Sequence, residues 1–185
     1  FNKYLYTMEP GNKGYEFVVD SSEANIGQKL PRIYHGADAQ MKWLHKNQSA
    51  TEFRAEYWWG TQTGSGITSE TPGTPLLLEK YYVRNFNGAF FYLLHSFDKH
   101  HQLGAKYDWY DPNSKVSGEE IGQDNGTRAA DIKFNTFQLG YVYYFSENLK
   151  AMAWYAFVNN EHTSLEEITG DLEDDVLTLR LQFRF

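Results

Sequence analysis

The sequence predicts an all-β fold, an antiparallel transmembrane β-barrel, and three observations lead to this prediction. Short segments alternate apolar and polar residues and are separated by clusters of Gly, Pro, Asn and Asp. Phe, Tyr and Trp make up 17% of the chain, which suits aromatic belts at two membrane interfaces. Short and long connections follow each other in strict alternation, as turns and loops do in outer-membrane barrels.

The last predicted strand, 176–185, shows the residue alternation most clearly. Its odd-numbered residues are apolar and its even-numbered residues are mostly polar: Leu177, Leu179, Leu181, Phe183 and Phe185 against Val176, Thr178, Arg180, Gln182 and Arg184. Successive side chains of a strand point to opposite faces, so this strand has one apolar and one polar face. A lipid-facing barrel strand has this pattern, and so does a half-buried strand of a soluble sheet.

The same reasoning predicts nine strands along the chain. In order, they are 1–8, 15–22, 33–44, 51–60, 81–95, 101–110, 133–145, 149–159 and 176–185. The first two carry aromatic and β-branched residues, and strict alternation supports most of the others. Segments 81–95 and 149–159 are apolar on both faces around 90–94 and 152–154, so the pattern predicts strands there without assigning their faces.

The connections between these strands also carry information. The short ones are 9–14, 45–50, 96–100 and 146–148, and the long ones are 23–32, 61–80, 111–132 and 160–175. Long loops are uncommon in compact soluble domains, whereas long extracellular loops opposite short periplasmic turns are typical of outer-membrane barrels. With the short turns in the periplasm, the last strand runs inward to a periplasmic C-terminus, and counting back makes the first strand run inward as well.

The strand count bears on the size of the barrel. Bacterial single-chain barrels have an even number of strands. Nine strands of which the first begins outside therefore predict that residues 1–185 form a single transmembrane domain, the C-terminal part of a larger barrel. The alternative is that the first segment is not a strand and that eight strands close by themselves.

Composition and charge exclude several other classes of protein. The chain has no run of about 18 uncharged apolar residues, so no transmembrane helix is predicted. The net charge of −7 argues against nucleic acid as a partner, because such binding needs clustered Lys and Arg. The chain has no cysteine, so it has neither a disulfide framework nor a thiolate metal site, and no cofactor is expected. The acidic segment 160–175 is expected to be a solvated loop, with divalent-cation binding near lipopolysaccharide as the alternative.

The polar strand faces are the candidate lining of a water-filled lumen. The charged residues predicted to line it and to select solutes are Asp38, Lys42, Arg54, Glu56, Lys106, Asp108, Arg180 and Arg184. The alternative is a network that only stiffens the wall, for instance Lys42 facing Glu52. The candidate interfacial belts are Tyr57, Trp59, Tyr107 and Trp109 at the outer side and Trp43, Tyr143, Phe145 and Phe185 at the inner side.

Neither a catalytic site nor a metal site is predicted. Glu52 and Glu56 stand four residues apart in one strand, about 13 Å, which is outside the range of a glycosidase pair. A pair across strands, such as Asp38 with Glu56, is the alternative. His100 and His101 are adjacent and point to opposite faces, so they are not expected to share a metal ion.

Several stretches of the chain resemble a known family. They are KYDWYDPN at 106–113 followed by VSG at 116–118, with support from YHGADAQ at 34–40, RAEY at 54–57, ADIK at 130–133 and LTLRLQF at 177–183. With these motifs the chain resembles the C-terminal half of the phosphate-selective porin O and P family. The resemblance implies a barrel on the order of sixteen strands, usually a homo-trimer, that passes small anionic solutes. The lumenal candidates carry both signs of charge, so they leave the solute open.

The function expected from the sequence is that of a porin, a passive diffusion channel for small solutes, anions among them, and not that of an enzyme. Its expected location is the outer membrane of a Gram-negative bacterium, with lipid and lipopolysaccharide as partners. Two alternatives stay open. One is a non-channel barrel that serves as a structural or protein-binding component of a larger envelope complex, and the other is a soluble all-β ligand-binding domain.

Overall fold

The computed structural model describes residues 4–12, 14–70 and 80–185, and these residues form nine strands of a single sheet. The strands are β1 (Leu5–Gly11), β2 (Gly14–Asp20), β3 (Ile33–Leu44), β4 (Ala50–Gly64), β5 (Tyr81–Ser96), β6 (His101–Asp111), β7 (Phe134–Tyr144), β8 (Leu149–Asn160) and β9 (Val176–Phe183). The connections hold 3-10 helices: η1 (Glu23–Asn25), η2 (Lys46–Gln48), η3 (Gly118–Glu120) and η4 (Ala129–Asp131). The predicted all-β fold is confirmed.

Strands β3 to β9 form an antiparallel meander, in which each strand pairs with the next one along the chain. Strand β3 begins and ends where the alternation predicts. Strand β4 continues to Gly64, past the predicted end at residue 60, because residues 61–64 extend its ladder with residues 82–85 of β5. None of the helices in the described residues is long and apolar enough to cross a membrane.

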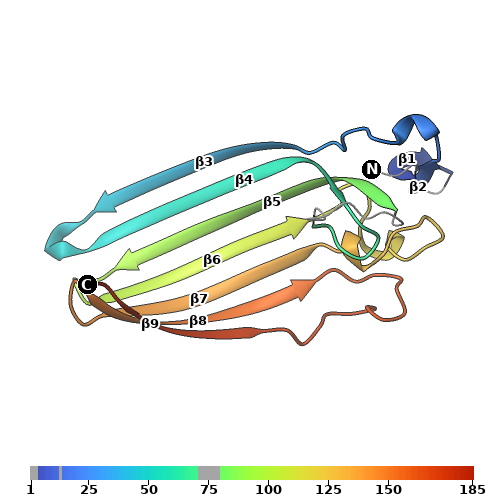
Figure 1. Cartoon of the computed structure of the whole chain (residues 1–185). Coiled ribbons are helices and arrows are strands. Elements are labelled where there is room, and N and C mark those ends of the chain that lie inside the picture. Colours follow the sequence, from blue (N-terminus) through green and yellow to red (C-terminus); the bar gives the residue numbers. More distant parts are fainter. Residues whose placement is uncertain (1–3, 13, 71–79) are drawn as a thin grey trace.

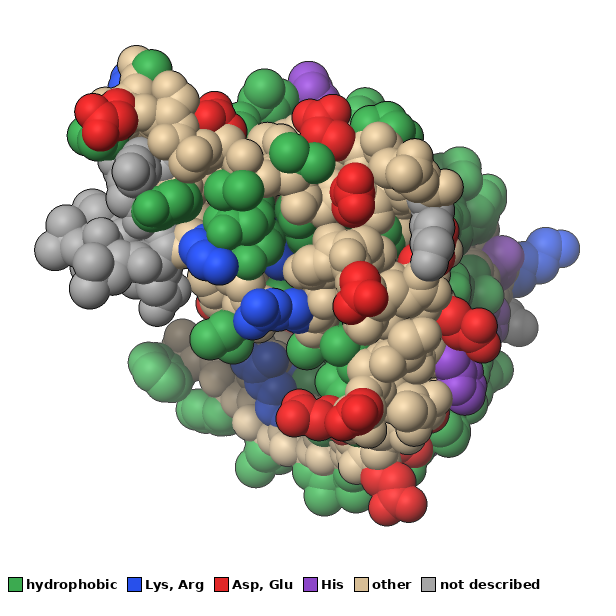
Figure 2. Space-filling model, turned by 90° about the vertical axis from the view of Figure 1, so that its right-hand side faces the viewer, with side chains coloured by type: hydrophobic (Ala, Val, Ile, Leu, Met, Phe, Trp, Pro, Cys, Tyr) green, Lys and Arg blue, Asp and Glu red, His purple; other side chains and the backbone are tan. Residues whose placement is uncertain are grey.

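The connections sort to two ends of the sheet (Figure 1). The turns 45–49, 97–100 and 145–148 lie at one end, with the C-terminus, and this is the short-turn end. The loops 112–133 and 161–175 lie at the other, the loop end. Figure 2 faces the loop end and shows Asp and Glu side chains spread over its surface, with Lys and Arg side chains in a hollow. Residues 71–79 of the predicted loop 61–80 lie outside the described residues.

Asp98 organises the turn between β5 and β6. Its Oδ1 accepts the backbone N–H groups of His100 at 2.6 Å and His101 at 2.8 Å. These two hydrogen bonds hold the pKa of Asp98 below its ordinary value of 3.8, and the one from His100 has the larger effect. A carboxyl group whose pKa is lowered by folding stabilises the folded state above its unfolded pKa, and this stabilisation is lost as the pH falls through the folded pKa.

We therefore expect Asp98→Ala to lower the denaturant midpoint of unfolding at neutral pH, whereas wild type and variant should converge in acid, well below pH 3.8. The measurement is equilibrium unfolding of both proteins at the two pH values. A difference of the same size at both would show that the carboxylate does not stabilise the turn.

The hairpin of β1 and β2 does not follow its predicted path. The prediction made the first strand a barrel strand that runs inward, with 9–14 among the periplasmic turns. In the structure β1 pairs with β2 and, over residues 5–7, runs parallel to the start of β5, so the hairpin lies at the loop end (Figure 1). Its predicted place was wrong, because alternation identifies a strand but not its partner. Residues 1–3 of the predicted strand lie outside the described residues.

A small hydrophobic cluster holds the hairpin at the loop end. Val116, Ile121 and Ile132 of loop 112–133 are buried in it. The residues that pack against them come from the hairpin, from β7 and from loop 161–175: Met8, Tyr15, Phe134, Leu165 and Ile168. The backbone N–H of Phe17 in β2 also donates to the carbonyl oxygen of Asn125 at 2.9 Å. Burial of these apolar side chains therefore favours the hairpin at the loop end.

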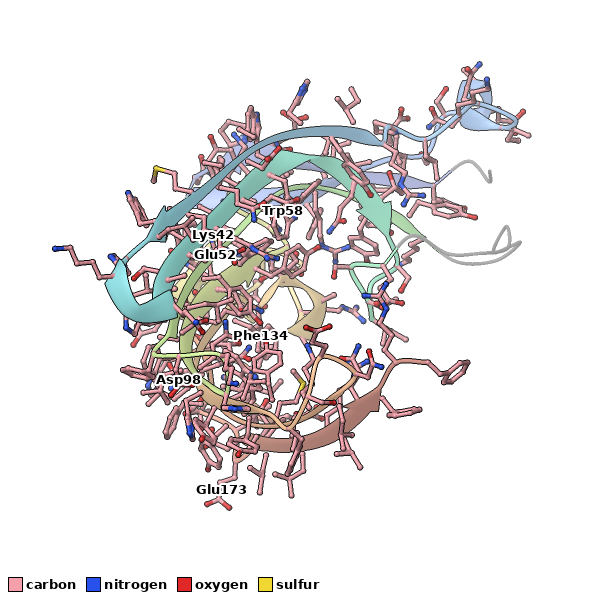
Figure 3. The ribbon with its side chains drawn as sticks, turned by 90° about the vertical axis from the view of Figure 1, so that its left-hand side faces the viewer. Lys42, Glu52, Trp58, Asp98, Phe134 and Glu173 are labelled. Carbon is pink, nitrogen blue, oxygen red and sulfur yellow. The ribbon has the colours of Figure 1, made fainter. Side chains whose placement is uncertain are left out.

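The sheet is strongly curved but open. Figure 3 looks along the strands from the short-turn end and shows the sheet bent into a trough. Among the described residues, no ladder joins β3 to β9. The alternative in which eight strands close by themselves is therefore not found, since the first segment does contain a strand and the sheet stays open.

Candidate functional site

The pairing register places apolar residues of successive strands side by side on one face of the sheet. One row across the sheet consists of Met41, Phe53, Leu93, Ala105, Leu139, Tyr155 and Leu177. Large side chains of this face are exposed to solvent. Leu179 is 72% exposed and Leu181 is 70% exposed. Figure 3 shows Lys42 and Glu52, from the other face, on the inner side of the curve, so the apolar face is the convex one.

The register also assigns the two strands whose faces the alternation left open. Phe91 of β5 and Ala153 of β8 lie in the convex rows. Their neighbours on the concave side are Phe90, Tyr92 and Leu94 in β5 and Met152 and Trp154 in β8. These strands are apolar on both faces because aromatic side chains form part of the concave wall as well.

Charged residues on the concave face fall into rows that differ in sign. Toward the loop end, Asp38 and Glu56 stand directly opposite each other on β3 and β4, and Asp108 of β6 is aligned with them. The next row toward the short-turn end contains Arg54 and Lys106. Along this part of the face, the row of carboxylates therefore lies closer to the loop end than the row of cations.

The structure brings most of the predicted lining residues together. Seven of the eight belong to the concave rows: Asp38, Lys42, Arg54, Glu56, Lys106, Asp108 and Arg180. The eighth, Arg184, follows the end of β9, and its backbone N–H donates to the carbonyl oxygen of Asn148 at 2.8 Å. Their role in a solute path stays a prediction, since their shared face is a matter of geometry alone.

Two ion pairs among the strand residues of this face run along strands and not across them. Arg54 pairs with Glu52 of the same strand, and Lys106 Nζ lies 2.6 Å from Asp108 Oδ1, also in one strand. Lys42 stands opposite Glu52 in the register. No ion pair joins Lys42 to Glu52 in the part of the chain that the structure describes, so these ion pairs do not tie neighbouring strands together.

Lys150 of β8 is a concave-face cation that the sequence reasoning missed. The register aligns it with Tyr144 and Gln182, and its Nζ lies 5.5 Å from the centre of the Tyr144 ring. Within the described ranges, neither Lys150 nor Arg180 has an ion-pair partner. Lys150 was missed because its strand is apolar on both faces, so alternation did not reveal which side it faces.

A cavity of about 410 Å³ opens on the concave face beside Lys150. Its polar and aromatic lining includes Glu52, Arg54, Tyr92, Gln102, Tyr144 and Trp154. Two cations, one carboxylate and several hydrogen-bonding groups therefore meet in one water-accessible hollow. Such a lining suits a small, hydrated, negatively charged solute better than an apolar one.

Trp154 shapes the floor of this cavity by lying flat over two glycines of neighbouring strands. A Cβ atom at Gly140 would come within 2.1 Å of Trp154 Cδ2, and one at Gly104 within 2.6 Å of Cη2. Glycine is required at both places because the indole approaches the backbone closely. The indole can therefore keep this place on the concave wall only while residues 104 and 140 have no Cβ atom.

Aromatic side chains on the convex face gather in two groups. Toward the loop end, the Tyr57 and Trp59 rings stack at 5.3 Å. Toward the short-turn end, Tyr143 meets Phe145 edge to face at 4.8 Å. His101 Nδ1 contacts Tyr141 Oη in this second group at 2.5 Å, whereas His100 Nδ1 contacts the carbonyl oxygen of Tyr144. Both imidazole rings also lie beside the Tyr143 ring, at 6.0 Å for His100 and 5.1 Å for His101, so the two adjacent histidines share this neighbour.

A comparison with protein families bears directly on this two-faced sheet. Residues 100–185 match the model of the phosphate-selective porin O and P family. The resemblance that the motifs indicated is thereby confirmed for this part of the chain, which spans β6 to β9 and the loops between them. No curated protein and no solved structure matched the chain.

The match to phosphate-selective porin O and P divides the candidate residues into two groups. Lys106, Asp108, Lys150, Arg180 and Arg184 lie within the matched segment. The charges of β3 and β4 lie before it, and they join the matched residues only through the register of β5. The family match thus covers only part of the charged candidates, and the face that they share comes from the pairing register alone.

Proposed function

We propose that the protein is an outer-membrane porin, a passive diffusion channel for small solutes, and that the concave face is part of the channel wall. The observation that carries this proposal is the register of β3 to β9, which keeps apolar residues on the convex face and charged residues on the concave face of every strand pair. The match of residues 100–185 to a porin family supports it.

The two faces call for two different solvents. Exposed Leu, Phe and Tyr side chains on the convex face suit the hydrocarbon of a bilayer, where they lose no hydrogen bonds. Lys150 and Arg180 on the opposite face have no ion-pair partner among the described residues. Such cations need water, because transferring an ion to hydrocarbon costs several kcal/mol. A curved sheet with lipid outside and water inside satisfies both requirements.

The charge pattern favours small anions as solutes. The carboxylates Asp38, Glu56 and Asp108 form one row, which lies closer to the loop end than the cations of the open concave wall do. From the next row to the short-turn end, the concave face carries Lys42, Arg54, Lys106, Lys150 and Arg180 against a single carboxylate, Glu52. This excess of positive charge would concentrate anions in the inner part of the channel.

The open edges of β3 and β9 favour completion by further strands. A barrel has no free edge, because unpaired backbone groups are costly in a membrane. The proposed unit is thus the C-terminal part of a larger barrel. From the resemblance to phosphate-selective porin O and P we further infer that this barrel forms a homo-trimer, surrounded by outer-membrane lipid and lipopolysaccharide.

The proposal predicts discrete conductance steps from the refolded complete barrel in a planar bilayer, with a reversal potential that shows anion preference. One unit charge acts on an ion about 8 Å away with about 0.5 kcal/mol in water, which changes its local concentration about twofold. Lys150→Gln and Arg180→Gln are each expected to lower the anion-to-cation permeability ratio about fourfold, because the local anion concentration falls and the local cation concentration rises by this factor.

Lys46→Gln is the matched control, because Lys46 is an exposed lysine in the turn after β3 and lies outside the concave rows. Its permeability ratio should equal that of the wild type. Equal effects of all three variants would contradict the assignment of the concave face. Silence from correctly folded wild-type protein would favour the alternative, a barrel that serves as a structural component.

A further inference from the structure

A buried ion pair fastens loop 112–133 to the concave side of the sheet. Arg84 of β5 and Asp131 of the loop have side chains that are 1% and 0% exposed. Arg84 Nε donates to Asp131 Oδ1 at 2.8 Å, and Nη2 donates to Oδ2 at 3.4 Å. Arg84 is an even number of residues from Phe90 and Tyr92 in β5, so its side chain is on the same, concave face. It contacts the loop there, near the loop end.

Both ends of the loop converge on this pair. Asn113, fully buried near the start of the loop, donates from Nδ2 to Asp131 Oδ1 at 2.7 Å. The backbone N–H of Arg128 donates to Asp131 Oδ2 at 2.9 Å, and Arg84 Nη1 donates to the carbonyl oxygen of Ser65 at 2.9 Å. Asn113 and Asp131 belong to the motifs 106–113 and 130–133, which the fold thus brings into direct contact.

Neighbouring segments are attached to the same loop. The Arg84 guanidinium carbon lies 5.4 Å from the ring centre of Phe17 in β2 and 5.2 Å from that of Tyr82. The Glu161 carboxylate, at the start of loop 161–175, accepts the backbone N–H groups of Gly118 and Lys133 at 2.8 Å each. The hairpin, the start of β5 and both loops therefore form one packed unit at the loop end, which is the far end of the trough in Figure 3.

A buried charge is stable only while its partner is in place. If loop 112–133 swung outward, Arg84 would lose Asp131 and face the aromatic rings of Phe17 and Tyr82 without a counterion. The ion pair therefore specifies one position of the loop, whereas apolar packing alone tolerates several. Such a contact determines the position of the loop more than it contributes to the stability of the sheet.

We propose that Arg84 and Asp131 are positioning residues that hold loop 112–133 across the loop end of the concave face, and that they thereby set the largest solute that the channel admits. The size limit rests on the proposed function, whereas the position of the loop does not.

Arg84→Met and Asp131→Asn each remove one charge of the pair at nearly constant volume, and either variant tests the proposal if the other fails to fold. Single-channel conductance should rise roughly twofold, because the constriction would widen. Vesicle-swelling assays should admit larger neutral sugars. Trypsin should cleave folded protein after Lys115 and Arg128 about tenfold faster, since cleavage proceeds from the opened loop.

Arg32→Met is the matched control, because Arg32 is an exposed arginine just before β3, and its Nε donates to Tyr34 Oη. It should leave conductance, sugar cut-off and proteolysis at wild-type values. Variants that conduct and resist trypsin like the wild type would overturn the proposal. A silent wild type would instead overturn the proposed function and the size limit, and proteolysis would then still decide whether the pair positions the loop.

Discussion

Replacement of Leu139 by lysine is expected to lower the free energy of unfolding in a lipid bilayer by about 2–4 kcal/mol. Leu139 lies in the middle of β7, between Ala105 and Tyr155 in a convex row, and its side chain is 49% exposed. If this face meets hydrocarbon, an ammonium group placed there loses its hydration without gaining a partner.

The matched control is Thr136→Lys, three residues earlier in the same strand. Thr136 lies on the concave face directly opposite Asp108, so the new ammonium would enter water beside a carboxylate. The expected change is within about 0.5 kcal/mol, as for most surface substitutions. Denaturant unfolding of protein refolded into phospholipid vesicles, followed by tryptophan fluorescence, measures both variants. Equal losses at the two positions would contradict the division into a lipid face and a water face.

A second large effect is expected from Gly140→Ala. The new Cβ would lie 2.1 Å from Trp154 Cδ2, so the indole must leave its place on the concave wall. Overpacking of this kind costs about 1–3 kcal/mol. Gly36→Ala is the matched control within a strand, because its Cβ would lie 3.7 Å from the nearest atom, the carbonyl oxygen of Tyr57, which is an ordinary contact.

A double-mutant cycle isolates the contact between the two residues. In the background Trp154→Ala, the substitution Gly140→Ala should cost much less, because the ring that it would meet is gone. The coupling energy from denaturant unfolding of the four proteins is expected to be about 1–3 kcal/mol. Additive effects would show that Trp154 does not lie over Gly140 in the folded protein.

The fold of β3 to β9 could be predicted from the sequence because its causes are local. A period of two identifies each strand, and the clusters of Gly, Pro, Asn and Asp between strands identify the connections. Local pattern also separated the two faces of β3, β4, β6, β7 and β9. For this reason, seven of the eight charged candidates do share one face in the structure.

The features that could not be predicted from the sequence all depend on contacts between residues far apart in the chain. The hairpin of β1 and β2 was recognised as two strands but misplaced, since its position depends on contacts with β5 and loop 112–133. Lys150 was missed because its strand is apolar on both faces. The pair of Arg84 and Asp131 joins residues 47 positions apart, and nothing in the neighbourhood of either residue indicates the other.

By itself the sequence determined that this protein is an all-β chain whose strands separate apolar from charged residues, because alternation along a strand is imposed by backbone geometry. It also determined the family resemblance that the match of residues 100–185 confirms. The tertiary structure alone decided which charges stand side by side, which face β5 and β8 present, and where loop 112–133 lies. These features depend on register and on the burial of charged groups, and both arise only when distant segments meet.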